Sequence, residues 1–246
     1  MLSWLFPLPL ATPEQREWVD RRFGWLTQQF GESALRKARV ILPSASYFPD
    51  RFDGKPEDIQ RMMERVCEYM AVDPEGIDLY MYDGSGPDLG PGHVVKGEGY
   101  AAGLYQKSER FRIGIEKSQA AAPMSLVATL AHELAHVLLS GGGRVAREEE
   151  DFEPLTDLAT VFLGLGIFGA NSCVNDSGWR TAGWSGWKVS RLGYLSQSTW
   201  SYALARWAKL RGDRNSAWIR HLRSDIRAGF RSETRLMQQR EHDRSR

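Results

Sequence analysis

The chain has 246 residues, of which 42% are hydrophobic and 26% are charged. These ordinary globular values exclude a wholly disordered or fibrous chain. Thirty-two Lys and Arg residues against thirty-one Asp and Glu residues leave a formal net charge of +1, so overall charge gives no reason to expect nucleic acid or an anionic membrane as a partner. Two cysteines, Cys67 and Cys173, are too few for a disulfide scaffold and favour a reducing compartment, so we expect a cytoplasmic protein.

Two apolar stretches differ from the patterns of signal peptides and membrane spans. Residues 1–10 contain two prolines and lack the basic region and small-residue cleavage site of a signal peptide. Residues 158–175 are uncharged, but they contain glycines and directly follow Asp157. We therefore expect a buried core helix there and a soluble protein without a membrane partner.

The first half of the chain carries both helix and strand patterns. A helix is expected to start at Thr12-Pro13, where a capping hydroxyl precedes a proline, and to end near Gly31. Apolar residues at helical or alternating spacing predict the elements that follow. These are a strand at 39–42, a helix at 56–70, a strand at 77–82 and a hairpin of 100–106 with 111–116.

The second half is expected to be mainly helical. A long apolar helix is predicted over residues 123–139 and another over 151–168, where Gly164, Gly166 and Gly169 would allow close approach to the first. Residues 171–193 are interpreted as a loop whose Trp179, Trp184 and Trp187 form either a lid or a cover over the core. The remaining predicted segments are helices at 198–210 and 216–229 and a charged, disordered tail at 231–246.

His132-Glu133-Leu134-Ala135-His136 is an H-E-x-x-H motif within the predicted helix 123–139. Residues four apart lie on one helix face, so both imidazoles can reach a single metal ion. Glu133 is turned by about 100° from His132, toward the place of a metal-bound water whose proton it can accept. The alternative interpretation is a pair of packed histidines on an amphipathic helix.

A catalytic zinc site needs a third protein ligand, and no histidine follows His136 closely. Glu153 and Asp157 are four residues apart and would share a face of the next helix, whose first turn tolerates Pro154. Glu153 is therefore the predicted third metal ligand, and Asp157 the carboxylate that orients His132. Residues 148–151 are expected to be a solvated acidic helix start.

This pattern resembles the gluzincin metallopeptidases, in which H-E-x-x-H is followed by a glutamate ligand and an aspartate four residues further on. The matching positions here are His132, Glu133, His136, Glu153 and Asp157, with Thr156-Asp157 similar to the Ser/Thr-Asp pair of that family. The resemblance covers roughly residues 100–170, and the gap between the second histidine and the glutamate is shorter than in the best-known members. It implies a zincin-like fold, a Zn²⁺ cofactor and a peptide substrate laid out along strand 111–116.

A tetrahedral oxyanion also needs a hydrogen-bond donor. Tyr194, which follows the tryptophan-containing segment, is the first choice, although a packing role is its alternative. The other candidates are Tyr202, His221, Arg191 and Lys188, while His93 is expected to be an ordinary loop residue.

Together these observations predict an α+β fold class, with a small mixed or antiparallel sheet packed on the metal-binding helix. Residues 1–230 would form one domain, with the sheet in 1–122 and the metal site in 123–230. The predicted function is a zinc-dependent hydrolase that cleaves a peptide or protein substrate. The alternatives are a metal-binding regulatory or interaction module and a structural domain whose motif is accidental.

Overall fold

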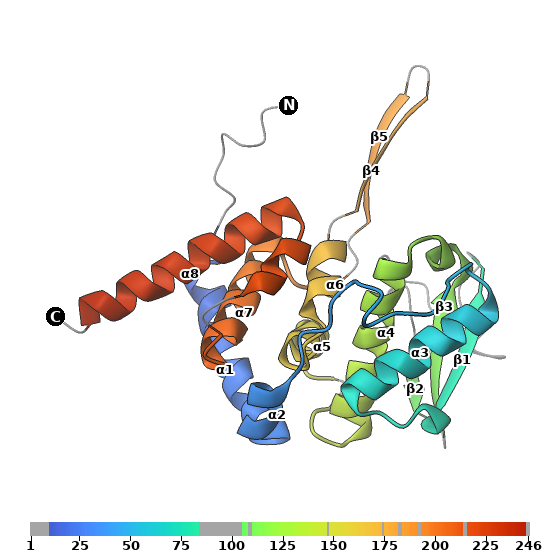
Figure 1. Ribbon diagram of the computed structural model, residues 1–246, viewed down its shortest axis with the longest axis horizontal. Coiled ribbons are helices and arrows are strands. Elements are labelled where there is room, and N and C mark those ends of the chain that lie inside the picture. Colours follow the sequence, from blue (N-terminus) through green and yellow to red (C-terminus); the bar gives the residue numbers. More distant parts are fainter. Residues whose placement is uncertain are drawn as a thin grey trace.

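The computed structural model describes residues 10–83, 105–107, 110–146, 148–173, 175–181, 184–190, 193–213 and 216–244. A mixed α+β arrangement results, in which helices predominate and a small sheet lies at one end (Figure 1). The helix α4 lies between that sheet and the helices α5 and α6, so the centre of the fold is helical.

Two of the three N-terminal helices begin and end where local sequence signals predict, and the short helix between them was not expected. Helix α1 (Pro13–Phe30) has a capping box, in which the Thr12 hydroxyl accepts a hydrogen bond from the backbone N–H of Gln15 and the Gln15 side chain accepts one from Thr12. It ends at Gly31, whose φ of +89° suits glycine. The short α2 (Glu32–Lys37) follows, and α3 (Pro56–Met70) occupies the predicted range.

The sheet has three strands in the order β1–β3–β2. Strand β1 (Ile77–Tyr82), which follows the 3₁₀ turn η1 (Pro74–Gly76), runs parallel to β3 (Phe111–Glu116). Strand β2 (Tyr105–Lys107) is antiparallel to β3 and pairs Tyr105 with Ile113, which confirms the antiparallel pairing of the predicted hairpin. Residues 100–104 of that prediction lie outside the described residues. The sheet is therefore mixed, and the purely antiparallel alternative is wrong.

Residues 39–42 were expected to form a strand and do not. Their backbone instead crosses the turn that follows α5, where the N–H of Ile41 donates a 3.0 Å hydrogen bond to the carbonyl of Gly164. A Cβ at Gly164 would lie 2.0 Å from the carbonyl oxygen of Arg39, and the φ of Gly164 is +92°. Glycine is thus required there both by the backbone conformation and by the close approach.

Gly164 also divides the helix predicted over 151–168. Helix α5 covers Phe152–Phe162 and α6 covers Gly166–Ser172. A Cβ at Gly169 would lie 2.5 Å from the ring of Trp200 on α7 (Gln197–Leu210), so this glycine admits α7. The expectation that these glycines serve contact with the metal-binding helix is therefore wrong.

The C-terminal residues are also more ordered than expected. A 3₁₀ turn η4 (Ala217–His221) takes the place of the first part of the predicted helix 216–229, and α8 (Ser224–Arg244) covers its second part and continues beyond it. The prediction of a disordered tail from residue 231 is wrong because Glu233, only 1% exposed, forms a buried ion pair with Arg16 at 3.0 Å. The same carboxylate accepts a hydrogen bond from the N–H of Ala11, which ties α8 to the start of α1.

The segment 171–193 was expected to be a loop. Beyond the end of α6, its backbone forms an antiparallel hairpin of β4 (Asn175–Thr181) and β5 (Trp184–Ser190) that projects from the helices (Figure 1). The expected roles of Trp179, Trp184 and Trp187 concern side chains outside the described part of the structure.

Helix α4 (Pro123–His136) continues into a π-helical turn η3 (Val137–Gly141) and follows the 3₁₀ turn η2 (Lys117–Ala121). Among the described residues, Pro123–Gly141 is the one helix whose length and composition would allow it to cross a membrane. Of its most apolar window, 67% is buried inside the protein, as in the core helix of a folded domain. Helix α3 packs against it on one side and α5 and α6 on the other.

Candidate metal centre

The H-E-x-x-H motif forms the last turns of α4 and is buried. His132, Glu133 and His136 are 9%, 2% and 4% exposed. Each of the three side chains offers one ligand atom, and these atoms lie within 4.8 Å of one another. The two imidazole rings are nearly perpendicular, with centroids 4.7 Å apart. The three side chains could therefore hold a metal ion, whereas the motif predicts the two histidines as ligands with Glu133 beside them.

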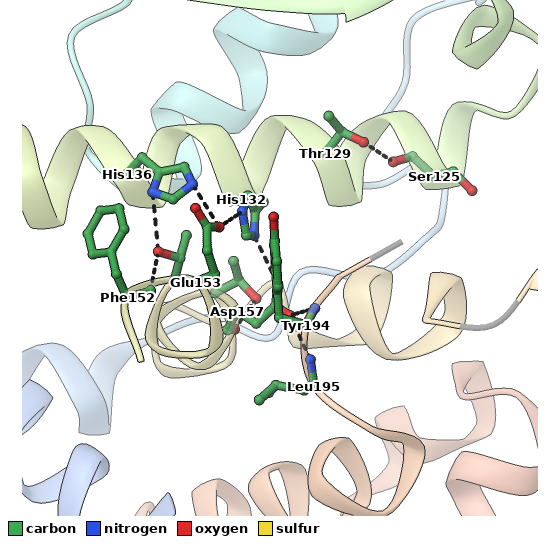
Figure 2. Close-up of polar contacts among 11 residues, drawn as sticks. Ser125, Thr129, His132, His136, Phe152, Glu153, Asp157, Tyr194 and Leu195 are labelled. Carbon is green, nitrogen blue, oxygen red and sulfur yellow. Dashed lines mark hydrogen bonds and ion pairs between the residues drawn. The ribbon is translucent and has the colours of Figure 1, made fainter. Parts of the chain in front are cut away.

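Helix α5 lies opposite this face of α4 and brings Glu153 to both rings (Figure 2). Its Oε2 atom lies 3.1 Å from Nε2 of His132 and 3.3 Å from Nε2 of His136. A tetrahedral metal site with bonds of about 2 Å separates its ligand atoms by about 3.3 Å, so this spacing suits three ligands of one ion. Pro154 lies in the first turn of α5, as expected, where a proline costs the helix no backbone hydrogen bond.

Asp157, one turn further along α5, is 4% exposed and holds the far side of the His132 ring. Its Oδ1 accepts a 2.9 Å hydrogen bond from Nδ1 of His132, so Nε2 is the ring nitrogen that faces Glu153 and could bind a metal. Its Oδ2 accepts the backbone N–H groups of Tyr194 and Leu195 at 2.6 and 3.1 Å. Both carboxylate oxygens are thus used, one for the histidine and one for a distant turn.

Gly193 makes that turn possible. Its φ is +96°, a region that side chains disfavour, and a Cβ there would lie 3.1 Å from Oδ2 of Asp157. The backbone turn at Gly193 therefore positions the Asp157 carboxylate, and that carboxylate positions His132. Sequence reasoning singled out the residues Gly193-Tyr194-Leu195 but not this contact.

His136 is held by two residues of α5 that the sequence did not assign to it. The Thr156 hydroxyl oxygen lies 3.3 Å from Nδ1 of His136 and 2.9 Å from the carbonyl of Phe152. The Phe152 ring packs against the imidazole, with centroids 4.9 Å apart. Thr156 lies three residues after Glu153, on the same helix face, and that spacing was the available sequence signal.

The protonation of the site follows from its burial and its carboxylates. Burial lowers the pKa of His132, but hydrogen bonds with Asp157 and Glu153 outweigh it and raise the pKa to about 10. Burial acts to raise the pKa of Glu153, yet hydrogen bonds from both histidines hold it well below its usual range. The basic His132 and the acidic Glu153 therefore stabilise each other's charged forms at this site.

Tyr194 lies beside the metal-binding histidines. Its ring stacks on His132, with centroids 5.8 Å apart and planes 20° from parallel, and the residue is 47% exposed. Figure 2 shows the side chain rising from its backbone near Asp157 toward α4. Burial and the nearby carboxylates of Glu153, Asp157 and Glu133 raise the pKa of its hydroxyl to about 12, so it remains a proton donor at neutral pH.

The other candidate donors are not brought to this group of residues. Tyr202 donates a 3.0 Å hydrogen bond to Asp20 on α1, and His221 contacts Arg220 in η4. Arg191, His93 and the side chain of Lys188 lie outside the described residues.

The acidic segment before α5 is more than a solvated helix start. Asp151 accepts hydrogen bonds from Trp18 at 2.6 Å and from Nε of Arg22 at 2.7 Å. Burial acts to raise the pKa of Asp151, but these hydrogen bonds outweigh it and lower the pKa. Both donors come from α1, which therefore anchors the start of the helix that carries Glu153. The expectation of a merely solvated segment is wrong for Asp151.

Comparisons with known proteins return no relative. No model of a protein family matches the chain, and no curated protein or solved structure matches it. The chemical interpretation therefore rests on the geometry of the site.

Proposed function

We propose that the protein is a zinc-dependent hydrolase, and specifically a metallopeptidase with a peptide or protein substrate. The observation that supports it most directly is the convergence of Nε2 of His132, Nε2 of His136 and a carboxylate oxygen of Glu153, at separations of 3.1 and 3.3 Å from the oxygen. Two imidazoles and one carboxylate are a ligand set of catalytic zinc, which keeps a fourth position for water.

Each residue of the candidate site has a defined role in this proposal. His132, His136 and Glu153 would hold Zn²⁺, whose Lewis acidity brings the pKa of a water toward 7. Glu133 would accept the proton of the attacking water at its carboxylate and later deliver it to the leaving amine nitrogen. Tyr194 would donate its hydroxyl proton in a hydrogen bond to the oxyanion of the tetrahedral adduct.

The surroundings of the site favour this chemistry over a purely structural ion. A structural zinc site is closed by four protein ligands, whereas this proposal uses three, His132, His136 and Glu153, and gives Glu133, which also lies near both rings, the role of the acid–base residue. Tyr194 and the Glu153 side chain are 47% and 36% exposed, so the site lies close to the protein surface. A regulatory metal-binding module would need neither Glu133 nor a hydroxyl donor.

The test compares the wild-type protein with Glu133→Gln and Tyr194→Phe. We expect one zinc per chain in all three by elemental analysis, because neither change removes a metal ligand. Peptide hydrolysis should fall by about 10²–10⁴-fold in Glu133→Gln and by about 10²–10³-fold in Tyr194→Phe, which keeps the ring that stacks on His132.

Unchanged turnover in Glu133→Gln would refute the mechanism. Zinc binding without any hydrolysis by the wild type would favour the regulatory module instead. A metal-free wild type that is indifferent to added zinc would leave only the structural interpretation of the motif.

A further inference from the structure

Thr156 and Asp157 are neighbours on α5, and each contacts Nδ1 of one of the two metal-binding histidines. Asp157 serves His132 with a charged oxygen, and Thr156 meets His136 with a neutral one. The question is whether the threonine contact is an incidental one or a directed hydrogen bond.

The single hydroxyl hydrogen of Thr156 determines whether its oxygen donates a hydrogen bond to His136 or accepts one. Thr156 has a single O–H, and its shortest contact is the 2.9 Å hydrogen bond to the carbonyl of Phe152, four residues back. Because that bond uses the hydrogen, the oxygen can only accept from His136, across 3.3 Å. His136 then carries a proton on Nδ1, and its Nε2, which faces Glu153, is the nitrogen left to bind a metal.

Burial protects the hydrogen bond between Thr156 and His136 and holds the His136 ring in one orientation. Thr156 is fully buried and His136 is 4% exposed, so water does not compete readily for this hydrogen bond. The Phe152 ring lies against the imidazole and limits its rotation. The carbonyl that orients the hydroxyl belongs to this same Phe152 residue.

We propose that Thr156 is the positioning residue of His136: its hydroxyl, which donates to the carbonyl of Phe152, accepts a hydrogen bond from Nδ1–H of His136 and fixes the tautomer and ring orientation that present Nε2 to the metal. This inference rests on the proposed metal site, but not on peptide hydrolysis. It assigns to α5 three tasks in one turn of helix, namely one ligand and the orientation of both histidines.

The test measures zinc affinity of the full chain by competition with a chromogenic chelator. Thr156→Val keeps the side-chain shape and removes the hydroxyl, and we expect zinc to bind about 10–100-fold more weakly. Thr156→Ser keeps the hydroxyl and should restore affinity to within a few fold. Thr160→Val is the matched control, because Thr160 is also buried on α5 with its hydroxyl bonded to a backbone carbonyl, at 2.7 Å from that of Asp157.

A second readout follows the proton itself. In ¹⁵N-histidine spectra of the zinc-loaded protein, we expect a protected Nδ1–H resonance for His136 in the wild type and in Thr160→Val, and its loss in Thr156→Val. Unchanged zinc affinity in Thr156→Val would overturn the proposal, as would an equal loss in Thr160→Val or no rescue by serine. A wild type that binds zinc without cleaving peptides would remove only the peptidase, whereas a wild type that binds no zinc would remove both.

Discussion

Replacing Asp157 by asparagine tests the link between the fold and the metal site. The asparagine side chain has nearly the same shape, but one of its two terminal atoms is a donor. The carboxylate now accepts from Nδ1 of His132 at 2.9 Å and from the N–H groups of Tyr194 and Leu195 at 2.6 and 3.1 Å. The amide can satisfy only one of these two sides, and its NH₂ group must face a donor on the other.

The magnitude follows from those contacts. A hydrogen bond to a charged group is worth about 1.5–3 kcal/mol, and a buried N–H left without an acceptor costs about 1–3 kcal/mol. Asp157 is 4% exposed, so solvent screening relieves little of this, and we expect a loss of about 3 kcal/mol in the free energy of unfolding. At roughly 2–4 °C per kcal/mol, Tm should fall by roughly 6–12 °C.

Zinc affinity should provide a second, independent measure of the effect of Asp157→Asn. If the amide NH₂ faces His132, the ring must turn its Nδ1 lone pair toward it and place a proton on Nε2, where the metal would bind. We therefore expect zinc affinity to fall about 10–100-fold as well.

Unfolding of Asp157→Asn is measured by urea titration with a chelator present, and zinc affinity by chelator competition. Asp53→Asn is the control, because Asp53 forms an exposed ion pair with Arg51, and we expect a change within about 0.5 kcal/mol. An Asp157→Asn protein as stable as the wild type would refute the reasoning that this carboxylate connects two distant segments.

Two further predictions concern the rest of the fold. Glu233→Gln should lower the free energy of unfolding by about 3–5 kcal/mol, because it leaves the Arg16 guanidinium, itself 12% exposed, without its charged partner. Glu241→Gln on the same helix, where the carboxylate is 61% exposed, should change it little in the same urea titration. Burial raises the pKa of Cys67 to about 12, so at pH 8 its thiolate fraction is about a thousandfold below that of an ordinary thiol. Iodoacetamide followed by mass spectrometry should label Cys67 only after unfolding, and fast labelling of the folded protein would contradict the buried environment.

The predictions that were confirmed rest on local signals. The capping box at Thr12, the apolar stripe from Pro56 to Met70 and the alternation in Ile77–Tyr82 each specify a single element through contacts between residues close in sequence. The H-E-x-x-H motif is also a local signal, because a spacing of four residues places the two histidines on the same face of one helix.

The predictions that were wrong depended on contacts between distant segments. The disordered tail was inferred from its charge, but Glu233 pairs with Arg16, more than two hundred residues away. The continuous helix over 151–168 was inferred from its apolar residues, but Gly164 breaks it where the backbone of Arg39 passes at close range. A periodic pattern shows that a residue is buried, and it does not show which partner buries it.

The sequence alone determined the candidate groups: two histidines and Glu133 on neighbouring turns of one helix, with an acidic pair on the next helix. Only the tertiary structure decided that Glu153 faces both rings, that Thr156 meets one of them, and that the Gly193 turn supports Asp157. The physical reason is that side-chain spacing along a helix is set by its own geometry. The approach of a second helix or turn is set by packing and by buried hydrogen bonds that local sequence does not encode.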